Sequence, residues 1–231
     1  MARTLYDLAG AEADRRFSPY CWRVKMALAH KGLPYETVPW RFTEKEAIAF
    51  SGQGLVPVLV DGERVVTDSW AICQYLDGAY PEAPLAEGPQ AWAHAFFIKN
   101  WTERSLQSAL SPLLYLDIFR QLRPKDQAYF RATREARVGM TLEAFGADVP
   151  GALEKLHKVL EPLRSTLSAQ PFVGGGAPSV ADYLVFGAFQ WARCVSPVQL
   201  VEADSPVFAW RGRMLQLYGG VAANSPGYAV S

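Results

Sequence analysis

The segment Phe17-Ser18-Pro19-Tyr20-Cys21-Trp22-Arg23 decides how the first part of this 231-residue chain folds. Proline suits the first position of a helix, because the N–H that it lacks would have no partner there, and serine is a preferred N-cap. Apolar residues then recur at helical spacing until Gly32 provides a C-terminal stop. We therefore predict a helix from Pro19 to His30, with the Ser18 hydroxyl at the tip of a strand-to-helix turn.

Short strands and helices surround this turn. Asp61-Gly62 between two apolar runs is a strong hairpin signal. The predicted elements are strands at Leu5–Leu8 and Tyr35–Val38, a short helix at Glu44–Phe50, strands at Val56–Val60 and Arg64–Val66, and a helix at Ser69–Tyr80. Together with the helix after Ser18 they follow the order βαβαββα, which favours a small mixed sheet covered by helices.

The character of the chain changes after residue 82. Residues 83–89 are rich in proline and glycine and read as a linker, so we expect an α+β domain over 1–82 and an all-α domain over 90–231. Helical periodicity runs through Gln90–Gln121, Lys125–Phe145, Gly151–Ser168, Ser179–Arg193 and Ser205–Tyr218. Pro112 is expected to end or kink the first of these helices.

Composition excludes several classes of function. Basic and acidic residues balance at 23 each, and the basic run Arg131–Arg137 contains an acid and reads as a solvated helix face, so a nucleic-acid partner is not expected. The three cysteines and three histidines are scattered without metal-ligand spacing, which predicts neither a disulfide framework nor a metal site. A strand begins within four residues of the start, and no apolar run reaches about 18 residues, so we expect neither a signal peptide nor a membrane span. We therefore expect the protein in the reducing cytoplasm.

Ser18 has two interpretations from local chemistry alone. As a helix cap it would contribute about 0.5–2 kcal/mol to stability and do nothing else. A helix N-terminus also presents free N–H groups and positive dipole, which favour a thiolate over a thiol, and a hydroxyl there could donate a hydrogen bond to a sulfur anion.

A family resemblance separates these interpretations. Ser18-Pro19-Tyr20-Cys21 resembles the C-P-Y-C redox turn of glutaredoxins with its first cysteine changed to serine. The whole chain resembles the cytosolic glutathione transferases that use an active-site serine. The resemblance implies a thioredoxin-like first domain, a catalytic role for Ser18 and loss of dithiol exchange. Cys21 is then expected to be a packed small residue.

The resemblance also implies a binding site for glutathione as co-substrate. Pro57 matches a proline that is cis in the thioredoxin superfamily, and Val56 before it would pair its backbone with the glutathione cysteinyl group. Asp68-Ser69 matches an acid-serine pair, usually Glu-Ser, that binds the γ-glutamyl group. Gln53 is a candidate for the remaining carboxylate, as more weakly are Arg41 and Lys45.

The electrophile would lie in an apolar pocket near Ser18. Tyr20, Tyr115, Phe119 and Trp191 are the candidate lining residues, while most aromatic residues of the helical domain, including Trp101 and Phe186, are expected in the core. Tyr6 is an alternative hydroxyl, because several transferase classes use an N-terminal tyrosine. Arg16 could add a positive field. In the Ser179-Val180-Ala181-Asp182 segment we expect a capping box that serves folding.

A narrower resemblance concerns Ser18-Pro19-Tyr20-Cys21-Trp22-Arg23 followed by Lys25–Gly32. This run is similar to bacterial β-aryl etherases, which use glutathione to cleave lignin-type ethers, and to their fungal serine-type relatives. The resemblance implies a bulky aromatic or ether substrate and a homodimer. Two other functions stay open: a non-catalytic carrier of glutathione and aromatic ligands, and a thiol oxidoreductase that uses Cys21.

Overall fold

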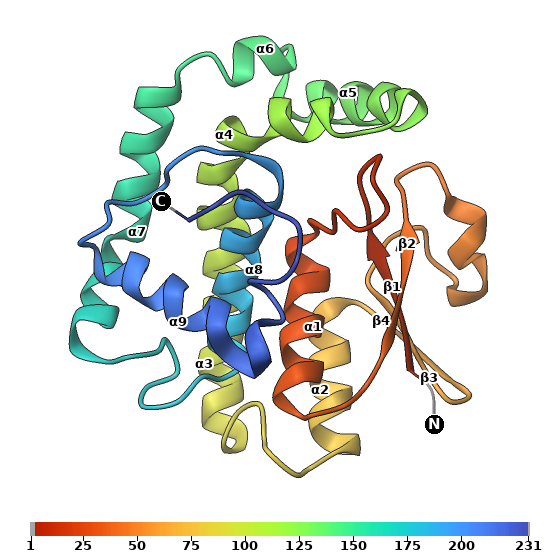
Figure 1. The fold of residues 1–231 in the computed structure, drawn as a ribbon, viewed down its shortest axis with the longest axis vertical. Coiled ribbons are helices and arrows are strands. Elements are labelled where there is room, and N and C mark those ends of the chain that lie inside the picture. The colour runs from red at the N-terminus through yellow and green to blue at the C-terminus, as the bar shows by residue number, and fades with distance from the viewer. Residues whose placement is uncertain (1–2, 231) are drawn as a thin grey trace.

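The computed structural model describes residues 3–230 and divides them into a sheet-containing part and a helical part (Figure 1). The first part contains β1 (Arg3–Leu8), α1 (Pro19–His30), β2 (Glu36–Trp40), the 3-10 helix η1 (Lys45–Ser51), β3 (Val58–Asp61), β4 (Arg64–Thr67) and α2 (Ser69–Ala79). The strand order is β2-β1-β3-β4, with β1 parallel to β2 and antiparallel to β3. The predicted α+β arrangement is therefore confirmed.

All the regular elements described in the second part are helices. It contains α3 (Gly88–Trp101), the π-helix η2 (Thr102–Leu106), α4 (Gln107–Arg120), α5 (Pro124–Val138), α6 (Leu142–Phe145), α7 (Val149–Ala169), α8 (Val180–Val195) and α9 (Pro206–Gly220). The segment Lys125–Phe145, expected as one helix, is two, because Gly139 takes a left-handed conformation with φ of 73° and ends α5. Ser179 and Asp182 form the predicted capping box of α8.

Pro112 does not end its helix, so the first of the two predicted effects, an end or a kink, is wrong. It lies inside α4, and the irregular stretch is the π-helical η2 one turn earlier, which joins α3 to α4. Leu110, Leu114 and Ile118 keep α4 buried on both sides of the proline. This packing outweighs the one backbone hydrogen bond that proline removes.

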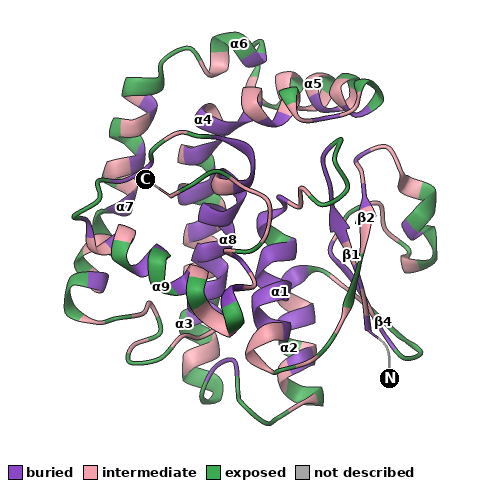
Figure 2. Cartoon of the chain, in the orientation of Figure 1, coloured by how far each residue is buried: buried purple, intermediate pink, exposed green. Residues whose placement is uncertain are grey.

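The two parts share one core, and α8 is at its centre. Nearly every residue of α8 is buried (Figure 2), and α1 is its main neighbour. The backbones meet at Gly187, where a Cβ atom would lie 2.3 Å from the carbonyl oxygen of Pro19. Only glycine allows this approach, which fixes the N-terminal end of α1 against the helical domain.

Candidate active site at the N-terminus of helix α1

Ser18 is the N-cap of α1, as the sequence predicts. Its backbone is extended, its side chain is buried with 3% exposure, and Pro19 occupies the first helical position. The Ser18 Oγ accepts the backbone N–H of Cys21 at 3.2 Å. Because the oxygen is used as an acceptor, the hydroxyl hydrogen can be donated to another group.

The Val56–Pro57 peptide bond is cis, as the family resemblance implies. The strand begins at Val58 and not at Val56 as predicted, because Pro57 has no N–H to donate to a ladder. Val58 pairs with Tyr6 of β1, so the proline turn enters the sheet at the strand next to the one that leads to Ser18.

Asp68 and Ser69 open helix α2. Asp68 has a left-handed φ of 68°, and its Oδ1 accepts the backbone N–H groups of Trp70 and Ala71, both at 3.0 Å. Its carboxylate is exposed, whereas Ser69 is buried and its Oγ lies 3.5 Å from the Arg23 guanidinium. The capping interpretation of Asp68 is confirmed.

A buried guanidinium connects Ser69 to the region of Ser18. Arg23 has no exposed surface, and its Nη1 donates to the Glu103 Oε1 at 2.6 Å. Its guanidinium lies 4.7 Å from the centre of the Tyr20 ring. Lys99 also binds Glu103, at 2.8 Å. Sequence reasoning missed this cluster, because partners 80 positions apart leave no local signal.

A cavity of about 360 Å³ lies beside Ser18. It brings Ser18 together with four of the predicted residues: Val56, Tyr20, Tyr115 and Trp191. Its wall is largely aromatic, and the further lining residues used below are Phe17, Trp40, Phe42, Phe130, Glu103, Gln107, Arg134 and Arg137. Tyr20 Oη donates to Gln107 Oε1 at 3.0 Å, which links α1 to α4 across the cavity. The volume suits a small aromatic molecule.

The remaining glutathione-site candidates do not line this cavity. Pro57 lies beside Val56, Asp68 and Ser69 lie at the start of α2, and Gln53 follows η1. Lys45 donates to the carbonyl of Gly54 at 2.6 Å, next to Gln53. Arg41 instead donates to the carbonyl oxygens of Gly10 and Ala11, so it supports the loop before Ser18.

Phe119 and Tyr6 lie outside the cavity as well. Phe119 packs under the Arg131 guanidinium of α5, whose carbon lies 4.4 Å from its ring centre, so its ring meets this arginine and does not line the cavity. The Tyr6 ring packs on Phe50 with centroids 5.4 Å apart, as expected for sheet packing. Arg16 lies 3.7 Å from the buried Asp7, whose carboxylate is also bound by Lys25 at 2.5 Å.

The basic run in α5 is only partly a solvated face. Arg131 binds Glu135 and Glu143 at the surface, in agreement with the prediction. Arg134 and Arg137 line the cavity beside Ser18, so the prediction of a wholly solvated face is wrong for these two residues. Sequence analysis could have detected this from spacing, since the two positions are three apart and share a helix face with Phe130.

Cys21 is packed away from solvent. Its exposed fraction is 0%, and burial, with the nearby Asp7 carboxylate, raises the pKa of its thiol well above the ordinary value. Cys73 and Cys194 are buried too. Within residues 3–230 no group of three metal-ligating side chains comes together, and no helix is long and apolar enough to cross a membrane.

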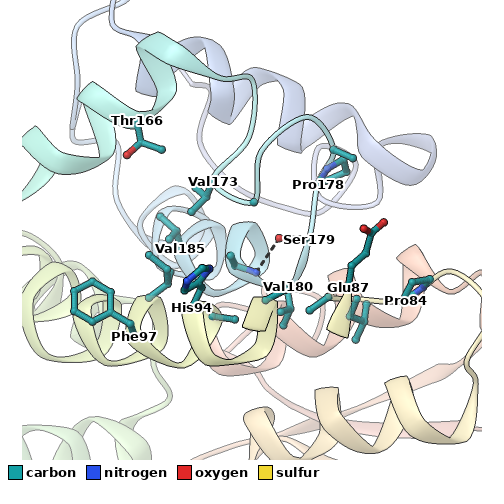
Figure 3. A pocket seen from close by; sticks show the side chains of 18 of the residues that line it. Pro84, Glu87, His94, Phe97, Thr166, Val173, Pro178, Ser179, Val180 and Val185 are labelled. Carbon is teal, nitrogen blue, oxygen red and sulfur yellow. Dashed lines mark hydrogen bonds between the residues drawn. The ribbon is translucent and has the colours of Figure 1, made fainter. Parts of the chain in front are cut away.

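A larger cavity of about 1110 Å³ lies elsewhere, between α3, α7 and the start of α8 (Figure 3). His94 and Phe97 of α3, Thr166 of α7 and Val173 before α8 contribute to its wall. The Ser179 hydroxyl in this wall accepts the N–H of Ala181 and so caps α8. Neither Ser18 nor Val56 lines it, so we place the candidate chemistry in the smaller cavity.

Comparison with known proteins gives consistent matches over both parts of the chain. Residues 13–84 match a family model described as the glutathione S-transferase N-terminal domain, and residues 93–217 match the C-terminal domain of the same description. Mouse glutathione S-transferase omega-1 is 26% identical over 205 residues, which is 87% of this chain and 74% of that protein.

Solved structures of similar shape include two fungal proteins. A glutathione S-transferase of Ceriporiopsis subvermispora, crystallised in complex with glutathione, is 26% identical with a TM-score of 0.79, covering 94% of this chain and 96% of that one. A glutathione transferase of Phanerochaete chrysosporium is 25% identical with a TM-score of 0.77, covering 95% and 92%.

Proposed function

The chain belongs to the glutathione S-transferase family, and from this premise we propose that it binds glutathione and presents its thiolate to an aromatic electrophile. The observation that supports this most directly is the buried Ser18 hydroxyl at the start of α1, in a cavity with an aromatic wall. In this proposal Ser18 is the catalytic residue and the cavity holds the electrophile.

Thiolate formation sets the energetic requirement. A free cysteine thiol has a pKa of about 8.5, so it is mostly protonated at neutral pH. Lowering that pKa by about 2–3 units requires roughly 3–4 kcal/mol of differential interaction with the anion. The dipole of α1 and a hydrogen bond from the Ser18 hydroxyl are the proposed sources. The hydroxyl acts as a donor to sulfur and need not ionise.

Glutathione would extend from this point along two neighbouring elements. The Val56 backbone before Pro57 would pair with the cysteinyl group. Asp68 and Ser69 would hold the γ-glutamyl group, for which Asp68 has a free oxygen, because both of its capping bonds go to Oδ1. Gln53 would meet the remaining carboxylate. The aspartate is one methylene shorter than the usual glutamate, so this contact is closer to the backbone of α2.

Cleavage of β-aryl ethers is the narrower form of the proposal. The thiolate sulfur would form a bond to the carbon that bears the aryloxy group, the C–O bond would break, and the phenolate would leave with the electron pair and take up a proton. The aromatic wall contributed by Tyr20, Tyr115 and Trp191 suits such a substrate. Failure to consume glutathione with β-aryl ethers would remove this form and leave the general one.

Two alternatives have different support. The larger cavity favours a non-catalytic carrier of aromatic ligands, which would keep aromatic binding after Ser18→Ala, whereas turnover in an enzyme would collapse. A thiol oxidoreductase using Cys21 is disfavoured, because that thiol is buried and kept protonated. It would require rapid alkylation of Cys21 in the native protein.

We also propose that the protein works as a cytoplasmic homodimer. Its three buried cysteines without disulfides suit a reducing compartment. Phe96 and Phe97 on α3 are 51% and 71% exposed, and aromatic residues clustered on a surface are typical of an interface.

The deciding experiment is a calorimetric titration with reduced glutathione at two pH values near 7, on the wild type and on Ser18→Ala. The proposal requires that the wild type binds glutathione and releases protons on binding, and that the variant binds without this release. A wild type that does not bind glutathione would refute the transferase function and favour the carrier.

A further inference from the structure

Two arginines face the cavity beside Ser18 without a carboxylate partner. The other arginines at this end of the molecule are paired: Arg123 binds Glu44 and Asp126, and Arg131 binds Glu135 and Glu143. For Arg134 and Arg137, no acid among residues 3–230 lies within ion-pair distance. The cavity therefore contains uncompensated positive charge.

Arg134 is held in an apolar setting. Its guanidinium lies 4.6 Å from the ring centre of Phe130 and 5.2 Å from that of Phe42, and its Nη1 donates to Thr133 Oγ1 at 2.9 Å. Burial and then the charge of Arg137 lower the pKa of Arg134, but a guanidinium stays protonated at neutral pH. Arg137 is exposed to solvent, and its like charge repels that of Arg134, so an anion beside them would stabilise both.

The carboxylate that shares the cavity cannot supply that anion. Glu103 is already bound to the buried Arg23 at 2.6 Å and to Lys99 at 2.8 Å. Movement toward α5 would leave the Arg23 guanidinium buried without its counter-ion, which is strongly unfavourable. Glu103 therefore does not neutralise Arg134 and Arg137, and an anionic group on a ligand in the cavity would do so.

Helix α5 holds both arginines in a fixed place over the first domain (Figure 1). Asp126 Oδ1 accepts the N–H and the hydroxyl of Thr43, at 3.0 and 2.9 Å. Phe42 stacks on Tyr129 of α5, with centroids 5.9 Å apart. The cavity thus has the Ser18 hydroxyl on α1 at one wall and two guanidinium groups on α5 at another.

We propose that the second substrate is an aromatic electrophile that carries an anionic group, such as a carboxylate, and that Arg134 and Arg137 select it. The inference rests on the proposed transferase function and names its substrate class. The aromatic ring lies against Tyr115 and Trp191, and the anionic group points to α5. Guanidinium groups suit this task, because they bind carboxylates through two parallel N–H donors.

A matched pair of test substrates separates charge from shape. In 4-chloro-3,5-dinitrobenzoate and 4-chloro-3,5-dinitrobenzamide, the thiolate forms a C–S bond at the carbon bearing chlorine, and chloride leaves with the electron pair. The thiol proton passes to solvent. We expect the wild type to prefer the benzoate by about 10-fold or more in kcat/KM, after division by the uncatalysed rates, because hydrogen bonds to charged groups are strong.

Four variants assign that preference to the two arginines. Arg134→Met, Arg137→Met and the double variant should lower the ratio of kcat/KM for the benzoate to that for the benzamide in increasing order, while the KM for glutathione stays close to wild type. Arg134→Lys should retain part of the preference. Arg120→Met is the matched control, since Arg120 is 65% exposed, pairs with Asp117 and does not line the cavity.

Binding of the unreactive 3,5-dinitrobenzoate, measured by calorimetry against its amide, gives a readout that does not depend on turnover. A wild type that binds glutathione and turns over the benzamide, but binds and uses the benzoate no better, would overturn the inference and leave the transferase function. So would a double variant whose only defect is a raised KM for glutathione, because the arginines would then bind a glutathione carboxylate. A wild type that neither binds glutathione nor turns over either compound would overturn both.

Discussion

The Ser18 Oγ accepts the backbone N–H of Cys21 at 3.2 Å, and this bond gives the hydroxyl two tasks. As an acceptor it caps α1 and stabilises the fold. As a donor it is free to bind a sulfur anion in the adjoining cavity. The cap also orients the hydroxyl, so stability and thiolate binding depend on the same side chain.

Ser18→Ala should therefore lower the free energy of unfolding by about 1 kcal/mol and, separately, abolish thiolate stabilisation. Ser205→Ala is a matched control, because Ser205 caps α9 through the N–H of Val207 and lies outside the cavity. It should lose similar stability in urea unfolding with no change in the pKa of bound glutathione. A Ser18→Ala protein with wild-type turnover would contradict the catalytic role.

Glu103→Gln should be far more damaging than its partial exposure suggests. Arg23 is fully buried, so loss of the carboxylate leaves its charge uncompensated, and we expect a loss of about 2–4 kcal/mol in urea unfolding. In the double variant Arg23→Met/Glu103→Leu, much of this loss should be recovered. Equal losses in the single and double variants would show that the ion pair is not the cause.

The Arg23–Glu103 pair also predicts that the stability of the fold depends on pH. Burial opposes ionisation of Glu103, but hydrogen bonds from Lys99 and Arg23 outweigh it and lower the pKa of Glu103 in the folded state. A carboxyl whose folded pKa is depressed stabilises the fold above its unfolded pKa of about 4.3, and this stabilisation is lost as the pH falls toward the folded value. The stability difference between the wild type and Glu103→Gln should shrink below that pH.

Local signals were sufficient to predict the first domain. Helix α1 has the predicted bounds, because the cap at Ser18, the proline after it and Gly32 all act within a few residues. The hairpin at Gly62 has the same origin. Pro112 shows where local reasoning fails. Helix α4 continues through it because α4 is buried against other helices, and the helix propensity of a single residue does not report such packing.

Sequence analysis predicted the backbone elements of the candidate site but not its charged contacts. The position of Ser18 at the start of α1 follows from the local motif, and the cis bond before Pro57 follows from the family resemblance. The Arg23–Glu103 pair joins residues 80 apart, and the role of Arg134 depends on α5 crossing over the first domain through Asp126 and Thr43. Contacts of this range are set by the packing of whole helices, so one sequence does not reveal them.

His30 should make stability depend on pH in the range near neutrality. Its Nδ1 lies 2.5 Å from the hydroxyl of Tyr183, which also contacts the hydroxyl of Tyr218. Burial, then the charge of Lys31, lowers the pKa of His30, against the opposing effect of Asp77. A folded pKa below the unfolded value of about 6.5 means that stabilisation is present above that pH and lost as the pH falls through the folded pKa.

His30→Gln tests this directly, since its amide oxygen can still accept from Tyr183 but does not titrate. Urea midpoints at pH 7.5, 6 and 5 should fall with pH in the wild type and fall less in the variant. Parallel falls in the two proteins would assign the pH dependence to other groups.

Aromatic residues on α3 make the proposed homodimer testable. Trp70 of α2 contacts Trp92 and Phe96 of α3, with ring centroids 5.1 and 5.6 Å apart, so the patch spans both domains. Phe97, the next residue along α3, lies at the wall of the larger cavity and is 71% exposed, and we expect a second copy to bury it. A central aromatic residue of an interface commonly contributes about 2 kcal/mol or more, so Phe97→Glu should raise the dimer dissociation constant by about 30-fold or more.

Light scattering after size-exclusion chromatography should then show a wild-type dimer and a monomeric variant. Phe50→Glu, a change at a 53% exposed aromatic residue of η1, should stay dimeric, and a wild type that is monomeric at micromolar concentration would refute the proposal.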